Sequence, residues 1–170
     1  MTVSIPQALP AHLGWRLLAL VYDLFPVLAL AFAGSAAMLL VRGGTPVEPG
    51  SAGAYGEAVW LWTLCGAYFV ISWQRGGQTL GMRPWRLRVV DANGQRAGWP
   101  ALATRYAFAT VPAIVGIELV ALLPGIERLL PFWIGAAIAA AGPLWSLFDR
   151  EGQALYDRFA GTRFVRLTPP

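Results

Sequence analysis

Residues 16–41, RLLALVYDLFPVLALAFAGSAAMLLV, form a long apolar stretch with a charge at its first position and another seven residues later. From Leu17 to Val41 it runs for 25 residues with Asp23 as its one charged side chain. At about 1.5 Å per residue, a helix of this length crosses a hydrocarbon core of about 30 Å. The stretch therefore predicts a membrane-spanning helix that contains a carboxylate.

A carboxylate inside a span costs about 3 kcal/mol on insertion scales, so such a group faces a protein partner or a water-filled cavity. Asp23 is therefore the first functional candidate. Arg16 lies two helical turns earlier on nearly the same face, about 10 Å away along the axis. We expect it to reach toward the interface or part of the way toward Asp23.

The composition agrees with a membrane protein of a single domain covering 1–170. Of its 170 residues, 56% are hydrophobic and 13% are charged, whereas soluble domains average about 25% charged residues. Cys65 is the one cysteine, which excludes an intrachain disulfide and a zinc site built from several cysteines. We expect no metal and no cofactor.

Four apolar runs, bounded by charges and by Gly or Pro, cover approximately 15–41, 58–75, 106–123 and 129–148. Helices are expected because lipid offers backbone groups no hydrogen-bond partner. The predicted fold class is an all-α integral membrane protein with four transmembrane helices in two antiparallel hairpins. A connection at 76–105 and a tail at 149–170 complete the chain.

Arginine placement predicts the orientation, because basic residues in short loops stay on the cytoplasmic side. All 13 basic residues are arginines, and 11 of them lie near the N-terminus, in the 76–105 connection with the preceding Arg75, or in the tail; Arg42 and Arg128 are assigned to the outer side. We expect a multi-pass protein of the bacterial inner (plasma) membrane with both termini cytoplasmic. Anionic lipid headgroups are the expected partners of the arginine-rich connection, and nucleic acid is not.

The connection and the tail predict a small cytoplasmic β element. Trp85–Val90 alternates like a strand and is followed by Asn93-Gly94, a hairpin signal, which predicts a weak return strand at 95–99. Thr162–Leu167 also resembles a strand and could pair with Arg86–Val90.

Residues 149–160 predict a short interfacial helix that ends at Gly161. Asp157 would lie near its C-terminal end, where the helix dipole disfavours a negative charge. It therefore requires a cationic partner, with Arg16 and Arg88 as candidates. Such a pair would be either a static brace or a gate.

Three segments in order resemble the RDD family of membrane proteins, named for one arginine and two aspartates. The first is Arg16-Leu-Leu-Ala followed by Tyr22-Asp23, and the second is Gly77-Gln-Thr-Leu-Gly-Met82 leading to Leu87-Arg-Val-Val-Asp91. The third is Gln153-Ala-Leu-Tyr-Asp-Arg-Phe-Ala-Gly-Thr162. The resemblance makes Arg16, Asp23 and Asp157 the name-giving residues. Where the family pattern usually has a lysine, this chain has Met82 followed by Arg83.

The resemblance implies transport as one activity, since some members of the family look like sodium–proton antiporters. Asp23 and Glu118, the two acids inside predicted spans, are the candidate ion- or proton-binding residues, with Tyr22, Tyr68, Ser72 and Thr110 as possible oxygen donors. Arg16, Asp157 and Arg88 are the candidate charge partners. The alternative is that Asp23 only fixes helix packing through hydrogen bonds.

No enzyme is expected, because His12 is the one histidine and neither a catalytic triad nor a phosphate-binding loop is present. Two functions remain open. One is a small secondary transporter exchanging Na⁺ for protons, which with four spans would require a homo-oligomer. The other is a membrane scaffold or assembly module in which the Arg/Asp/Asp charges serve packing.

Overall fold

The computed structural model describes residues 8–123 and 129–167. Its long helices are α1 (Leu13–Val41), α2 (Ala52–Gly76), α3 (Trp99–Ala121) and α4 (Leu130–Leu144), the last extended by the 3-10 turn η1 (Trp145–Leu147). Each of these four is long and apolar enough to cross a membrane. A short helix, α5 (Leu155–Ala160), and three strands complete the described chain.

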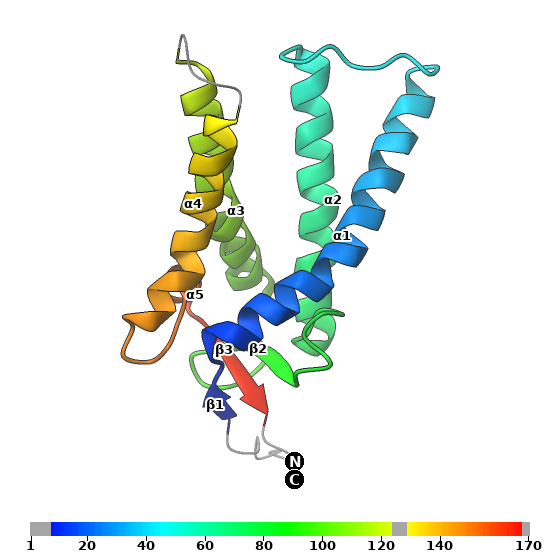
Figure 1. Ribbon diagram of the computed structural model, residues 1–170. Coiled ribbons are helices and arrows are strands. Elements are labelled where there is room, and N and C mark those ends of the chain that lie inside the picture. The colour runs from blue at the N-terminus through cyan, green and yellow to red at the C-terminus, as the bar shows by residue number, and fades with distance from the viewer. Residues whose placement is uncertain (1–7, 124–128, 168–170) are drawn as a thin grey trace.

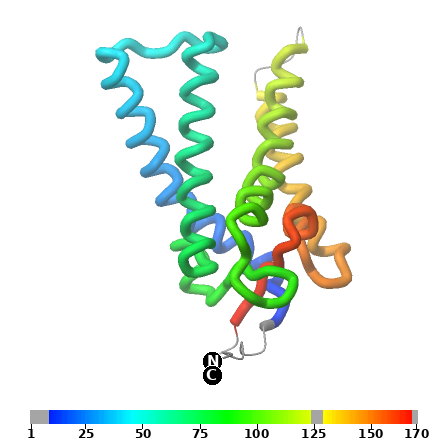
Figure 2. Tube along the Cα trace, turned by 180° about the vertical axis from the view of Figure 1, so that it is seen from behind, coloured from blue at the N-terminus to red at the C-terminus, as the bar shows by residue number. Residues whose placement is uncertain are grey.

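The long helices form two pairs that diverge from a shared base (Figure 1). Helix α1 pairs with α2, and α3 pairs with α4, while the first turns of α1 extend toward the base of the α3–α4 pair (Figures 1 and 2). The loop 42–51 joins α1 to α2 at the far end. We call that end of the molecule the loop end, and the opposite end, which carries the strands, the sheet end.

The sheet contains β1 (Ala8–Pro10), β3 (Thr162–Leu167) and β2 (Leu87–Asp91) in the order β1-β3-β2, with both pairings antiparallel. In its register Leu87 lies opposite Arg166 and Asp91 opposite Thr162. The predicted pairing between the connection and the tail is therefore confirmed. Strand β1 has no strand-like pattern in the sequence and was not predicted.

The packed core lies at the sheet end. Its buried members include Trp73 from α2, Leu102 and Tyr106 from α3, and Leu87 and Phe164 from the sheet. Toward the loop end, large apolar side chains are exposed instead, among them Phe32, Leu40 and Leu119. Such a surface is suited to lipid, so the protein combines a compact base with helices whose outer parts face the membrane.

Several predicted boundaries were wrong. Helix α3 begins at Trp99 and not near 106, because Gly98 is its N-cap and Pro100 occupies its first turn, where proline is favoured. The expected return strand at 95–99 is therefore absent: the chain turns after Asp91 and enters α3. Arg128, one of the two arginines assigned to the outer side, lies outside the described residues.

The tail helix also differs from the prediction. Only Leu155–Ala160 is helical, and residues 149–154 form turns. Asp157 consequently lies in the first turn of α5 and not near its C-terminal end. There its carboxylate accepts a hydrogen bond from the backbone N–H of Ala154 at 3.2 Å, so the expected conflict with the helix dipole does not arise.

Candidate functional site

Asp157 lies fully buried between two arginines from different helices. Arg16, in the first turn of α1, donates from Nη1 to Asp157 Oδ2 at 2.7 Å, and Arg105 of α3 pairs through Nη1 with Oδ1. The Thr162 hydroxyl donates to Oδ1 at 3.3 Å. One carboxylate thus joins α1, α3, α5 and β3. The predicted contact of Asp157 with Arg16 is present, and Arg105 takes the place proposed for Arg88.

The turn before α5 supplies further acceptors for Arg16. Its Nη2 donates to the carbonyl of Gly152 at 2.9 Å and its Nε to the carbonyl of Ala11 at 3.2 Å. Gly152 adopts a φ of 63°, a conformation that favours glycine. Each of the three guanidinium nitrogens of Arg16 therefore donates to an acceptor, and its side chain is 3% exposed.

The turn itself is held by Asp149, which accepts hydrogen bonds from the backbone N–H groups of Gln153 at 2.8 Å and Glu151 at 3.1 Å. Arg158 contacts the same carboxylate at 2.5 Å. These donors, the Gln153 N–H first, lower the pKa of Asp149, and the carboxylate raises the pKa of Arg158. Asp149 thus fixes the loop that presents Gly152 to Arg16.

Aromatic rings surround the two guanidinium groups. The Phe164 ring lies 4.7 Å from Cζ of Arg16 and 5.4 Å from Cζ of Arg105. Arg105 also lies over the rings of Trp73 at 5.0 Å and Tyr156 at 4.9 Å. Such cation–π contacts stabilise buried arginine. Even so, Nε of Arg105 and Nε1 of Trp73 are buried without a hydrogen-bond partner among the described residues.

Asp23 is the second buried carboxylate, 3% exposed, and its partners are uncharged. Its Oδ1 accepts from the hydroxyl of Tyr68 at 2.7 Å and from the backbone N–H of Gly81 at 2.9 Å. Its Oδ2 accepts from the hydroxyl of Thr79 at 2.5 Å. Among the ion pairs of residues 8–123 and 129–167, none includes Asp23.

Gly81 allows the loop after α2 to approach this close to α1. A Cβ at that position would lie 2.8 Å from the backbone nitrogen of Asp23, and it would also overlap the carbonyl of Ala19. Any larger residue would therefore push the loop away from Asp23. The glycine is required here by proximity, since its φ is not positive.

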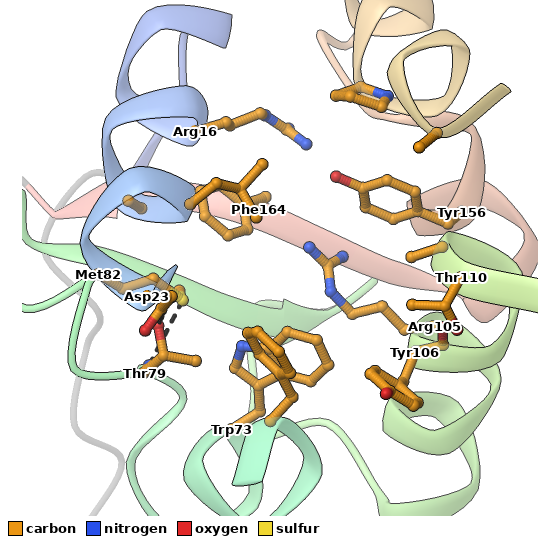
Figure 3. Close-up of a pocket in the computed structure, with 16 residues that line it drawn as sticks. Arg16, Asp23, Trp73, Thr79, Met82, Arg105, Tyr106, Thr110, Tyr156 and Phe164 are labelled. Carbon is orange, nitrogen blue, oxygen red and sulfur yellow. Dashed lines mark hydrogen bonds between the residues drawn. The ribbon is translucent and has the colours of Figure 1, made fainter. Parts of the chain in front are cut away.

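A cavity of about 240 Å³ lies between Asp23 and the arginines. Figure 3 shows Asp23 and Thr79 on one side of it and Arg105 and Tyr156 on the other. Its walls come from the four long helices, the loop after α2, α5 and β3. Apolar side chains make up much of the lining: Leu20, Phe69, Met82, Ala109, Ala139 and Pro143.

The other predicted residues lie away from this cavity. Glu118 is exposed on α3 and does not line it, so the structure does not bring Glu118 and Asp23 together around it. Arg88 packs its stem over Gly77, at the end of α2. Met82 is 2% exposed in the core, while Arg83, the next residue, is exposed.

Among the possible oxygen donors, Tyr68 contacts Asp23. Thr110 lines the cavity but donates to the carbonyl of Tyr106 at 2.8 Å. The sequence interpretation missed Thr79 and Gly81 as partners of Asp23, although both belong to the Gly-Gln-Thr-Leu-Gly segment. It missed Arg105 because that residue was assigned to a polar connection. A helix start signalled by Gly98 and Pro100 could have placed Arg105 on the inner face of α3.

Comparison with known proteins supports the sequence pattern. The chain matches no curated protein and no solved structure. Residues 10–161, which contain Arg16, Asp23, Asp157 and all of the described cavity lining except Phe164, match the RDD family. The four apolar helices and this match, which covers most of the sequence, establish that the chain is a membrane protein and belongs to the RDD family.

Proposed function

We propose that this protein is a small secondary transporter that exchanges a monovalent cation, Na⁺, for protons at Asp23. The observation that carries the proposal is the environment of that carboxylate. It is buried in a membrane-spanning helix, lines a cavity and has only neutral hydrogen-bond donors among the described residues. A carboxylate inside a membrane span requires compensation of its charge, and a proton or a bound cation at Asp23 would supply it.

Thr79 gives the site a way to accommodate a proton. When Asp23 is ionised, the Thr79 hydroxyl donates to Oδ2. When Oδ2 carries a proton, that proton can be donated to Thr79 Oγ1, because a hydroxyl both donates and accepts. The two donors to Oδ1 stay in place. Asp23 can thus change protonation state by rotation of one hydroxyl group.

Na⁺ would use the oxygen atoms of the same group. A hard cation prefers carboxylate, hydroxyl and carbonyl oxygens, and Asp23, Thr79 and Tyr68 supply the first two kinds in one cluster. Because proton and Na⁺ would both neutralise the same carboxylate, each would displace the other. Competition for Asp23 is the basis of the exchange that we propose, and Glu118 has no part in it.

Arg16, Arg105 and Asp157 act in this proposal as a static brace. Their contacts join four elements at the sheet end, and a buried ion pair of this kind needs no moving part to explain it. Four spans provide few walls for a transport path, and the helix pairs diverge toward the loop end (Figure 1). We therefore propose that the working unit is a homo-oligomer.

The test is cation-driven proton flux in liposomes containing the purified protein. Wild type is expected to move protons when Na⁺ is added, and Asp23→Asn to abolish the flux while remaining folded. Asparagine can keep the acceptor at Oδ1 and donate to Thr79, but it does not titrate. Glu118→Gln is the matched control, since it removes an exposed acid from α3, and it is expected to retain flux.

One observation favours a second function, that of a membrane scaffold. All three donors to Asp23 come from α2 and the loop that follows it, so the carboxylate also attaches that loop to α1. If attachment were its whole role, Asp23→Asn would retain activity in any assay and no cation would drive proton flux. The same liposome experiment therefore separates the two functions.

A further inference from the structure

A second cavity, of about 260 Å³, lies at the sheet end beyond the last turn of α2. Three arginines line it: Arg75 from the end of α2, Arg88 from β2, and Arg96 from the turn before α3. Its remaining walls are glycine, valine and glutamine residues, and none of the described acidic residues lines it. We call this cavity the arginine cradle.

The charges of the arginine cradle are unbalanced. Among the ion pairs found within residues 8–123 and 129–167, none includes Arg75, Arg88 or Arg96. Nε of Arg88 is buried and has no hydrogen-bond partner among the described residues. Buried donors are nearly always satisfied, and like charges around one cavity repel each other. An anion in the cradle would remove both penalties.

Other contacts do not account for this arrangement. The C-terminus of α2 carries a partial negative charge of about half a unit, which is less than the three positive charges around it. Gly77, the C-cap, closes α2 through its own N–H to the carbonyl of Trp73 at 2.7 Å. It also leaves room for Arg88, whose Cγ would lie 2.7 Å from a Cβ at Gly77. The backbone is thus shaped to hold the Arg88 side chain over the cradle.

The position of the arginine cradle suggests what fills it. Arg75 lies in the last turn of a helix that can cross a membrane. Trp99, 51% exposed, begins α3 three residues after Arg96, and tryptophan is enriched at the membrane–water interface. Basic pockets at this level bind the phosphate of anionic lipids, because guanidinium groups match phosphate oxygens in charge and geometry.

We propose that the arginine cradle is a binding site for the phosphate of an anionic phospholipid. Arg75, Arg88 and Arg96 hold the phosphate oxygens, and the buried Nε of Arg88 is one of the donors. The site is separate from the cavity at Asp23, with which it shares no lining residue. The inference therefore goes beyond the proposed exchange and does not depend on it.

The experiment measures binding of phosphatidylglycerol and phosphatidylcholine to the purified full chain by native mass spectrometry. The test variant is Arg75→Gln with Arg96→Gln, both exposed in the structure. The matched control is Arg83→Gln with Arg150→Gln, which removes the same charge from exposed arginines that do not line the cradle. A folded-state check by circular dichroism accompanies each protein.

Wild type is expected to retain phosphatidylglycerol in preference to phosphatidylcholine. Each arginine near an anionic lipid contributes about 1 kcal/mol, so the test variant is expected to bind phosphatidylglycerol roughly 25-fold more weakly. The control pair is expected to bind like wild type. Equal binding of the two lipids, or an equal loss in the control pair, would overturn the proposal.

A second arm distinguishes a lipid phosphate from a soluble one. Inorganic phosphate is titrated into the protein in phosphatidylcholine nanodiscs, with binding followed by calorimetry. We expect no saturable binding at millimolar phosphate. Saturable binding that disappears in the Arg75→Gln/Arg96→Gln variant would overturn the lipid assignment and identify the cradle as a site for a soluble phosphate. Neither measurement depends on Asp23. A failure of the lipid proposal can therefore be distinguished from a failure of the proposed cation exchange.

Discussion

Replacing Asp157 with asparagine should destabilise the protein more than any substitution of an exposed charge. The carboxylate is 0% exposed and pairs with two guanidiniums whose side chains are 3% and 4% exposed. Its removal leaves both cations buried without their counter-charge. Breaking a buried pair from one side costs about 3–5 kcal/mol, a large share of the roughly 5–15 kcal/mol typical of folded proteins.

Of the two arginines, Arg105 should lose more of its stabilising contacts when Asp157 is replaced. Arg16 keeps two backbone carbonyl acceptors, at Ala11 and Gly152, whereas Nη1 of Arg105 keeps only the Thr162 hydroxyl at 3.3 Å among its described contacts. Removing Arg105 together with the charge of Asp157 should therefore recover part of the loss. We expect the double variant Arg105→Met/Asp157→Asn to lose at least about 1 kcal/mol less than the sum of the two single variants.

The assay is reversible unfolding in mixed micelles with increasing sodium dodecyl sulfate, followed by circular dichroism. Glu151→Gln is the control, since Glu151 forms an exposed ion pair with Arg163 at 3.3 Å, and such pairs contribute about 1 kcal/mol or less. If Asp157→Asn unfolded within about 1 kcal/mol of wild type, Asp157 would not be the counter-charge of two buried arginines. Additive losses in the double variant would equally refute the reasoning.

Three further perturbations test other contacts. Gly81→Ala should lower the unfolding free energy by about 1–3 kcal/mol through overpacking against α1, whereas Gly14→Ala, which has open space around its Cβ, should not lower it. Unfolding of both variants in micelles checks this prediction, and equal stability of the two would contradict it. Thr79→Val should raise the Na⁺ concentration needed for half-maximal proton flux, because Asp23 Oδ2 loses its hydroxyl partner; an unchanged value would remove Thr79 from the site. The lowered pKa of Asp149 predicts a contribution to the unfolding free energy that is present above the unfolded-state pKa of about 3.9 and is lost as the pH falls through the folded-state pKa. Between pH 6 and pH 3, the unfolding free energy of Asp149→Asn should therefore fall less steeply than that of wild type. Parallel pH curves for the two proteins would exclude this contribution.

The spans could be predicted because long apolar runs carry their own signal. The stretch after Arg16 forms α1 nearly as expected, and the pairing of β2 with β3 followed from alternating side chains. Strand β1 could not be predicted, because Ala8–Pro10 becomes a strand only by pairing with β3. Short edge strands of this kind depend on tertiary contact more than on local sequence.

The candidate site was predicted in part, and two features of it were not. Charged residues were assumed to end a membrane helix, so Arg105 was placed in a connection although it lies inside α3. A buried arginine can lie there because Asp157, 52 positions later in the sequence, supplies its counter-charge. The second feature is the position of Glu118: a shared site with Asp23 required the two acids to face each other, which the sequence left open. Rotation of helices about their axes is set by packing, which apolar runs do not encode.

The most direct test of the proposed exchange is the protonation state of Asp23 itself, followed by infrared difference spectroscopy of the purified protein as Na⁺ is added at low pH. We predict that Na⁺ removes the C=O band of one protonated carboxyl group. The band change should be absent in Asp23→Asn and unchanged in Glu118→Gln. A wild-type spectrum unaffected by Na⁺, or the same band change in Asp23→Asn, would contradict competition between Na⁺ and a proton at this carboxylate.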